Sequence, residues 1–252
     1  GLKYRKIHPS PKPPALMRDI IKFFTKSDGK ILDPFCGVGG TLLVASLAGG
    51  TRTAVGIELE ERFIDAYNTV CEKEGIEKKT MIHDDSMNMM NHKEVSETTF
   101  DLILADPPYS DMMGKKRTGQ RKKLYNDDSA TPYSNKEVDL GNMEEDAFYE
   151  ALRNIMQLCF DRLKDNGYMV VFCKDFQPEP GNPHLLHADI INELTKIEGI
   201  EYRGMRIWHD QAMSLFPFGY PYSFTMNQLH QYILIFRKEG KKNGKKGSER
   251  RV

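Results

Sequence analysis

Short apolar runs alternate with amphipathic segments along most of the chain. The runs that predict strands lie at 30–33, 53–57, 80–83, 100–105, 168–173, 202–208 and 231–236. Apolar residues at helical spacing predict helices at 15–24, 41–47, 60–74, 144–164 and 187–197. Strands that alternate with helices are typical of an α/β protein with a parallel sheet.

The length and the order of these elements predict one domain. The chain has 252 residues, of which 39% are hydrophobic, and this is enough for one full α/β core with modest insertions. The alternation of predicted strands and helices stops from about 110 to 141. A loop of this length in a compact domain is usually functional or disordered. The tail at 239–252 is rich in lysine and glycine and is expected to be disordered. We therefore expect one domain over 1–238 with an insertion at about 110–141.

A glycine-rich turn follows the first predicted strand. The strand ends at Asp33, and the turn contains Gly37 and Gly39 before a helix that begins near Thr41. Glycines permit a tight turn and close approach of a ligand, and the start of the helix offers free N–H groups. The next strand ends on Glu58, about 20 residues after the first glycine, where a ribose-binding carboxylate is expected. A tight loop without a ligand is the alternative, but the two flanking carboxylates favour an adenosine cofactor.

The strand at 100–105 runs directly into Asp106-Pro107-Pro108-Tyr109. Each proline fixes φ and lacks an N–H, so the turn is stiff and offers acceptors without local donors. Asp106 adds a carboxylate and Tyr109 an aromatic face. This arrangement suits a planar group that carries an –NH2, such as adenine or cytosine, whereas the alternative is a turn that only closes a buried strand.

Six basic residues follow this turn within the predicted insertion. They are Lys115, Lys116, Arg117, Arg121, Lys122 and Lys123. A solvated charged loop is one interpretation, but the position of the run favours contact with nucleic-acid phosphates. Because 36 Lys and Arg residues equal 36 Asp and Glu residues, any polyanion site must be a local patch.

Several other features carry little functional signal. The aromatic segment at 216–224 packs on the core or stacks on bases, and the pattern does not favour either. The four cysteines show no CxxC spacing and predict buried thiols in a reducing compartment. We see neither a signal peptide nor a membrane-spanning run, so we expect a cytoplasmic protein without a membrane partner. No metal site is predicted, because nothing completes a ligand set around His184 and His187.

Several motifs together resemble the DNA amino-methyltransferases that use S-adenosylmethionine. The segment from His8 to Pro13 resembles the cofactor-capping segment of this family, Asp33 to Thr41 its glycine motif, and Asp106 to Tyr109 its catalytic motif. Segments at 140–142 and 230–238 are also similar to segments of these enzymes. The resemblance implies an α/β, Rossmann-like class I methyltransferase fold. Such a fold has a seven-stranded, mostly parallel sheet with helices on both faces and an antiparallel final hairpin.

The resemblance also implies roles for individual residues. Asp33 and the backbone of the glycine turn would hold the methionine part of the cofactor, Glu58 the ribose hydroxyls, and Asp85 with Ser86 the adenine edge. The residues expected to bind the cofactor are His8, Lys12, Pro13, Asp33, Pro34, Phe35, Gly37, Gly39, Thr41, Glu58, Asp85 and Ser86. The catalytic residues are Asp106, Pro107, Pro108 and Tyr109. The Asp106 carboxylate and the Pro107 carbonyl would accept hydrogen bonds from the target –NH2, and Tyr109 would stack on a base flipped out of the duplex.

The expected substrate is adenine in duplex DNA, methylated at N6. An Asp at the start of the catalytic tetrapeptide is more typical of adenine enzymes than of cytosine enzymes, which more often carry Ser. N4-cytosine methylation and methylation of RNA amines are the alternatives. An inactive nucleic-acid-binding module is disfavoured, because it would be expected to have lost Asp106 or Tyr109. Only 110–141 and 209–230 are free to read sequence, so a specificity subunit or a missing N-terminal domain is a further expected partner.

Overall fold

The computed structural model describes residues 2–8, 11–109, 132–175, 184–210, 217–218, 225–226 and 228–240. The six basic residues of the insertion, most of the aromatic segment at 216–224 and most of the tail lie outside these residues. Predictions about them therefore stay predictions. None of the described helices is both long and apolar enough to cross a bilayer.

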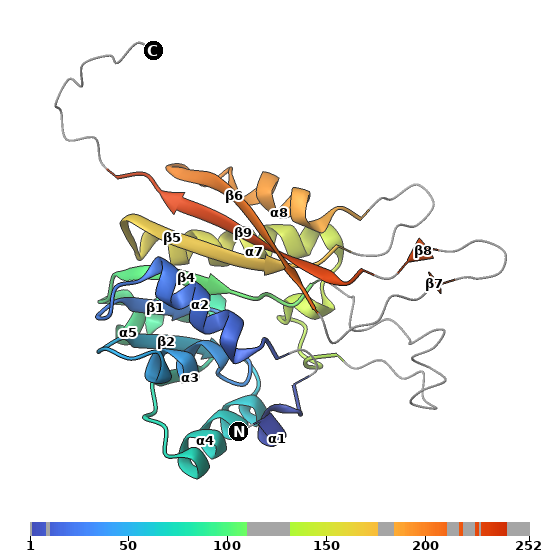
Figure 1. Cartoon of the computed structure of the whole chain (residues 1–252). Coiled ribbons are helices and arrows are strands. Elements are labelled where there is room, and N and C mark those ends of the chain that lie inside the picture. The colour runs from blue at the N-terminus through green and yellow to red at the C-terminus, as the bar shows by residue number, and fades with distance from the viewer. Residues whose placement is uncertain are drawn as a thin grey trace, which may run out of the picture.

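One seven-stranded sheet forms the centre of the molecule, in the strand order β3-β2-β1-β4-β5-β9-β6 (Figure 1). Its strands are β1 (Lys30–Asp33), β2 (Thr53–Glu58), β3 (Thr80–His83), β4 (Phe100–Ala105), β5 (Leu163–Cys173), β6 (Ile200–His209) and β9 (His230–Lys238). The first five are parallel, and β9 is antiparallel to both β5 and β6. This arrangement confirms the predicted sheet and its antiparallel final hairpin. A separate two-stranded ladder joins β7 (Pro217–Phe218) to β8 (Thr225–Met226).

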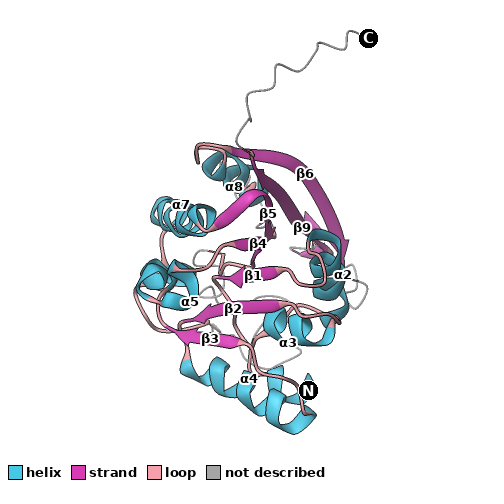
Figure 2. Cartoon of the chain, turned by 90° about the vertical axis from the view of Figure 1, so that its left-hand side faces the viewer, coloured by secondary structure: helices cyan, strands magenta, loops and turns pink. Residues whose placement is uncertain are grey.

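Helices cover both faces of the sheet, as predicted (Figure 2). The α-helices are α1 (Leu2–Arg5), α2 (Pro14–Phe24), α3 (Gly40–Leu47), α4 (Glu61–Glu74), α5 (Lys93–Ser96), α7 (Glu145–Asp161) and α8 (Leu186–Leu194). Short 3₁₀ helices are η1 (Ser86–Asn91) and η3 (Leu140–Asn142). In Figure 2, α2 and α3 lie on one face, α5, α7 and α8 on the other, and α4 beside β3 at one edge.

The burial of β4 explains why its sequence is continuously apolar. Leu102 and Leu104 pack into the cluster that includes residues of α2 and α3, whereas Ile103 and Ala105 pack into the cluster of α7 and α8. None of these four side chains is more than 1% exposed. A parallel strand covered on both faces has no polar side, so alternation is lost.

The predicted helix at 144–164 is too long by its last turn. In the structure α7 ends at Asp161 and β5 begins at Leu163, so residues 165–167, which separate the predicted helix from the strand predicted at 168–173, lie inside the strand. The pairing shifts register between Phe100 and Leu102, and Asn166 adopts a positive φ of 63°. Lys164 forms an ion pair of 2.8 Å with Asp101 of β4. The cross-strand ion pair and the irregular register let the strand continue through residues that are typical of a turn.

Candidate functional site

Carboxylates follow three adjacent strands at the same edge of the sheet. Asp33 ends β1, Glu58 ends β2 and Asp106 directly follows β4. Because parallel strands present their carboxyl ends at one edge, these side chains meet around one cavity of about 920 Å³, part of it open to solvent. Ligands of open α/β sheets bind at this edge. This location makes the cavity the candidate site.

The cavity brings together most of the residues predicted from sequence. Those that line it are His8, Lys12, Asp33, Pro34, Phe35, Gly37, Thr41, Glu58, Asp85, Ser86, Asp106 and Pro108. Pro13, Gly39, Pro107 and Tyr109 are not among the described lining residues, although each is a sequence neighbour of one or two that are. Pro13 precedes α2 and Gly39 precedes α3, so these two residues shape the helix starts.

Asp33 fixes the glycine turn from within the protein. Its carboxylate accepts hydrogen bonds from the backbone N–H of Phe35 at 3.0 Å and from the Thr41 hydroxyl at 2.5 Å. Gly39 has φ of 74° and forms the N-cap of α3. Because L-residues rarely adopt this conformation, glycine is required for the tight entry into the helix.

Glu58 is held by two backbone donors. Its Oε2 accepts from the N–H of Gly37 at 2.6 Å and its Oε1 from the N–H of Glu60 at 2.8 Å. Burial raises the pKa of Glu58 to about 7, and burial likewise raises the pKa of Asp33 to about 7. The site therefore contains two carboxyl groups that titrate near neutral pH.

We expect the Glu58→Gln variant to gain stability relative to the wild type as the pH rises. The folded-state pKa of about 7 lies above the ordinary value of 4.5, so the contribution of Glu58 to stability is largest below about pH 4.5 and is lost as the pH rises through 7. Gln stays neutral throughout. The free energy of unfolding of the variant, relative to wild type, should rise by about 1–3 kcal/mol between pH 5 and pH 8. Urea unfolding at the two pH values measures this, and a constant difference would contradict the assigned titration.

Asp85 and Ser86 sit beside the turn after β1. The Ser86 hydroxyl donates to the carbonyl of Pro34, and Asp85 accepts from the N–H of Met87 at 2.9 Å as the N-cap of η1. The Ser86 bond ties the segment after β3 to the loop after β1, and the Asp85 bond caps η1. Both residues line the cavity on its β3 side.

The Asp106 carboxylate has a partner on each oxygen. Lys12 Nζ lies 2.6 Å from Oδ2, and the Tyr109 hydroxyl donates to Oδ1 at 2.9 Å. The Lys12 side chain is 6% exposed and that of Asp106 is 23% exposed. The ammonium also lies 5.3 Å from the ring centroid of Phe172. Lys12 thus contacts the predicted catalytic carboxylate, although the sequence suggested a place beside the cofactor.

His8 sits in an aromatic contact at the cavity. Its ring lies edge-on to Phe63 at 4.9 Å and tilted against Tyr133 at 5.2 Å between centroids. Burial lowers its pKa to about 4. Neutral His8 therefore contributes to the cavity wall at physiological pH.

The segment at 132–142 supplies lining residues that the sequence did not reveal. Tyr133, Val138, Asp139 and Leu140 line the cavity, together with Arg5 and Phe63 from the N-terminal half of the chain. Tyr133, Val138 and Asp139 lie in a stretch without periodicity, so no local signal was available for them, whereas Leu140 begins the segment at 140–142 that resembles the family. Asp139 accepts from the Ser134 hydroxyl at 2.5 Å and from the N–H of Gly141 at 2.9 Å.

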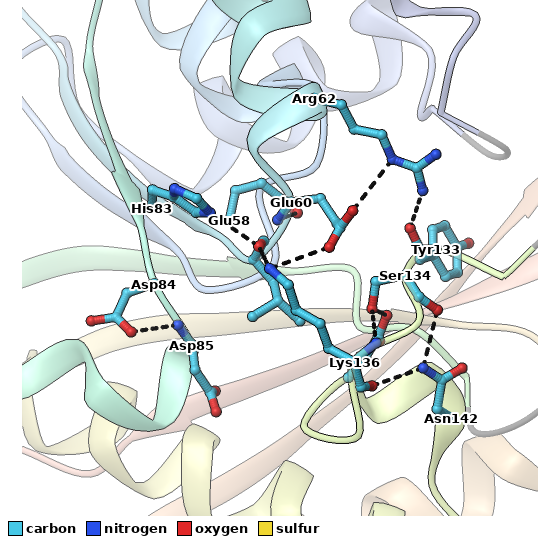
Figure 3. A network of polar contacts seen from close by, with 12 residues as sticks. Glu58, Glu60, Arg62, His83, Asp84, Asp85, Tyr133, Ser134, Lys136 and Asn142 are labelled. Carbon is cyan, nitrogen blue, oxygen red and sulfur yellow. Dashed lines mark hydrogen bonds and ion pairs between the residues drawn. The ribbon is translucent and has the colours of Figure 1, made fainter.

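Polar contacts join this segment to the turn after β2 (Figure 3). Lys136 donates to the carbonyl of Leu59 and lies 3.3 Å from Oε1 of Glu60. Arg62 lies 3.4 Å from Oε2 of Glu60 and donates to the carbonyl of Tyr133. The network thus ties Tyr133 to the start of α4, and Tyr133, Glu58 and Glu60 all line the cavity. Within the described chain, no group of three His, Cys, Asp or Glu side chains is placed to hold a metal ion.

Comparisons with known sequences identify similar proteins. A family model described as "DNA methylase" matches residues 2–69 and 100–250. The Type II methyltransferase M.ScaI of Streptomyces caespitosus is 46% identical over 61 residues, which are 24% of this chain and 19% of that protein. A tRNA (guanine(10)-N2)-dimethyltransferase of Methanothermobacter thermautotrophicus is 29% identical over 130 residues, or 51% of this chain and 36% of that protein. The chain thus spans about a fifth and about a third of these two relatives.

The fold also has solved counterparts. A Listeria monocytogenes protein assigned to the class I S-adenosylmethionine-dependent methyltransferases superposes with a TM-score of 0.56 at 16% identity, covering 96% of this chain and 64% of that one. At this identity the comparison concerns the fold alone. It confirms the predicted Rossmann-like class I architecture.

Proposed function

Because the chain belongs to the family of DNA methylases whose model spans most of its length, we propose that it transfers a methyl group from S-adenosylmethionine to the N6 amine of adenine in DNA. The observation that carries the proposal is the position of Asp106. Its carboxylate lies on the rigid Asp-Pro-Pro-Tyr turn at the wall of the cavity that Asp33 and Glu58 also line. A methyl donor and an amine acceptor can therefore meet at one site.

The hydrogen-bond acceptors that line the cavity match the donor groups of S-adenosylmethionine. The ligand carries two ribose hydroxyls, an adenine amine, an α-amine and a sulfonium, all of which are stabilised by acceptors or negative charge. The cavity presents the carboxylates of Asp33, Glu58 and Asp85 on three neighbouring loops. Glu58 is assigned to the ribose, Asp33 and the glycine turn to the methionine part, and Asp85 with Ser86 to the adenine. When bound, the cofactor supplies an electrophilic methyl group.

The chain's own residues align the target amine. The lone pair of an adenine amine is delocalised into the ring, so the nitrogen is a weak nucleophile. Hydrogen bonds from the –NH2 to the Asp106 carboxylate and the Pro107 carbonyl would draw the nitrogen toward tetrahedral geometry and aim its lone pair at the methyl carbon. Lys12 and Tyr109 each hold one Asp106 oxygen, and a carboxylate retains further lone pairs for the amine. Positioning and acceptors aimed at the developing positive charge supply the rate acceleration.

A base in duplex DNA must leave the helix to reach this turn. Tyr109 is the proposed stacking partner of the flipped base, as the resemblance implies. Tyr109 is 7% exposed, so stacking on a base requires its side chain to move when the base enters. The assignment to adenine rather than cytosine rests on Asp at position 106.

Methylation of an RNA amine is the second candidate. The tRNA methyltransferase relative aligns with a longer part of this chain than the Type II DNA methyltransferase does. Sequence recognition by a separate subunit or domain remains part of the proposal, because the chain spans only part of either relative.

Neutralising the basic run should weaken binding to duplex DNA. Replacing Lys115, Lys116, Arg117, Arg121, Lys122 and Lys123 with Gln or Ser removes cations proposed to bind phosphates. We expect the slope of log Kobs against log salt to fall by about one for each phosphate that is no longer neutralised. Fluorescence anisotropy over a salt series measures the slope. An unchanged slope would show that the run does not bind the DNA backbone.

The proposed reaction is tested by transfer of a labelled methyl group. The protein is incubated with labelled S-adenosylmethionine and unmethylated duplex DNA, and the DNA is digested to nucleosides. Label in N6-methyladenine supports the proposal, and label in N4-methylcytosine would correct the base. Label in tRNA alone, in a parallel reaction, would favour the second candidate.

A further inference from the structure

Arg5 is a buried cation without an acidic partner in the described part of the chain. It is the last residue of α1, is 4% exposed and lines the candidate site. Among the described residues, its one hydrogen bond runs from Nη2 to the carbonyl of Lys12 at 3.4 Å, and its buried Nε has no hydrogen-bond partner there. Buried charges are normally paired and hydrogen-bonded, so this guanidinium has unused capacity.

Two other buried cations of this protein are hydrogen-bonded through every side-chain nitrogen or paired with an acid, in contrast to Arg5. Arg52, 6% exposed, donates to the Thr25 hydroxyl, the Thr25 carbonyl and the Gly49 carbonyl at 2.7–3.2 Å. Lys12 lies 2.6 Å from the Asp106 carboxylate. A guanidinium offers five N–H donors, and Arg5 uses one of them in a long bond. Burial accordingly lowers the pKa of Arg5.

The unused guanidinium lies against the glycine turn. A Cβ added to Gly40, the first residue of α3, would lie 3.0 Å from Nη2 of Arg5. The start of this eight-residue helix carries a partial positive charge. Arg5 and the helix start therefore favour negative charge at this end of the cavity. Asp33 also lies here, but its carboxylate is occupied by the Thr41 hydroxyl and the N–H of Phe35, whereas Glu58 and Asp85 present carboxylates from the loops after β2 and β3.

We propose that Arg5 binds the α-carboxylate of the methionine part of S-adenosylmethionine. The proposal rests on the proposed function and adds the residue that recognises the one anionic group of the cofactor. A planar guanidinium matches a carboxylate with two parallel hydrogen bonds. Lys12 is a poorer candidate because Asp106 already neutralises it. Arg5 thus distinguishes the intact amino-acid tail from a tail that lacks the carboxylate.

The test compares two ligands on two proteins. Isothermal titration calorimetry measures the affinity of wild type and of Arg5→Met for S-adenosylmethionine and for its decarboxylated analogue, which retains the sulfonium and the amine. We expect Arg5→Met to weaken binding of S-adenosylmethionine by about 10- to 100-fold, the range for a charge-assisted hydrogen bond. The decarboxylated analogue should bind both proteins within about twofold, because it has no group for Arg5 to bind.

Matched variants separate recognition from folding. Arg18→Met, an exposed arginine of α2, should change neither affinity, and Arg5→Lys should recover part of the loss. Without ligand, Arg5→Met should unfold at the same temperature as wild type or higher, because it removes an uncompensated buried charge. Equal weakening of both ligands by Arg5→Met, or equal affinity of wild type for both, would overturn the assignment while leaving the proposed function standing. Failure of wild type to bind either ligand would overturn the cofactor and the proposed function together.

Discussion

Replacing Asp106 should eliminate methyl transfer while S-adenosylmethionine still binds. In the proposed function the carboxylate binds the target amine, whereas Asp33 and Glu58, which accept hydrogen bonds from Thr41 and from the N–H of Gly37, are assigned to the cofactor. We expect transfer to DNA to fall by at least about 10²- to 10³-fold, the cost of removing one aimed polar group from an active site. Cofactor affinity, measured by calorimetry, should stay within about threefold of wild type.

Two variants are needed because Asp106 also neutralises Lys12. Asp106→Ala leaves this lysine without its carboxylate, and we expect a loss of about 1–3 kcal/mol in the free energy of unfolding, discounted for the partial exposure of Asp106. Asp106→Asn also removes the counter-charge of Lys12, but it keeps the shape of the side chain and one acceptor for the ammonium. Transfer should be lost in both variants, and the free energy of unfolding should fall less in Asn than in Ala.

Asp101 provides the matched control, on the strand that leads to Asp106. It forms an ion pair with Lys164 at 2.8 Å and lies near the amino end of β4, away from the cavity. Asp101→Asn removes a paired carboxylate without touching the site, so transfer should remain at the wild-type level. If Asp106→Asn retained full transfer, or if it lost cofactor binding as well, the proposed division between the cofactor and amine sides would be wrong.

The features predicted correctly from sequence depend on local patterns. The strands at 30–33 and 53–57 were readable because each apolar run ends at an acidic residue and a glycine turn follows the first run. The topology then brings Asp33, Glu58 and Asp106 to one edge, because parallel strands end on the same side. A sheet buried on both faces also makes strand assignment simple, since the runs are continuously apolar.

The features that were missed depend on contacts between distant segments. Lys12 and Asp106 are 94 positions apart, and nothing in either local sequence indicates that they form an ion pair. Tyr133 and Asp139 lie in a stretch without periodicity, where the network around Glu60 and Lys136 determines their place. The start of β5 differs from the prediction for the same reason: Leu163 pairs with Phe100 and Tyr168 with Leu102, so Asp165 to Gly167 lie in an irregular part of the strand between two paired positions.

Gly39→Ala should destabilise the fold and disturb the site. Comparison with Gly49→Ala separates the backbone cost of the substitution from its steric cost. Gly39 and Gly49 have nearly the same φ, 74° and 78°. A Cβ on Gly39 would overlap Cδ2 of the Tyr67 ring and lie 2.8 Å from its Cγ, whereas a Cβ on Gly49 meets nothing within 4 Å. Both variants therefore incur the cost of placing alanine in a left-handed backbone conformation, but only Gly39→Ala adds a steric clash.

Tyr67 cannot move aside cheaply. Its ring is 1% exposed, and its hydroxyl accepts from the N–H of Lys79 at 2.7 Å and lies 3.2 Å from the Lys79 carbonyl. We expect Gly49→Ala to cost about 1–2 kcal/mol for the backbone alone and Gly39→Ala about 1–3 kcal/mol more for overpacking. Urea unfolding of the two variants measures the difference.

Cofactor binding gives the second readout of this clash. Gly39 caps α3 beside Gly37, whose N–H donates to Glu58. A displaced turn in Gly39→Ala should therefore lower the affinity for S-adenosylmethionine by more than about tenfold. Gly49 follows α3 at the opposite end, so Gly49→Ala should leave the affinity unchanged. Equal effects of the two variants on both stability and affinity would mean that Tyr67 yields to the added methyl group. In that case the glycine would be required only for its backbone conformation and not for close packing against Tyr67.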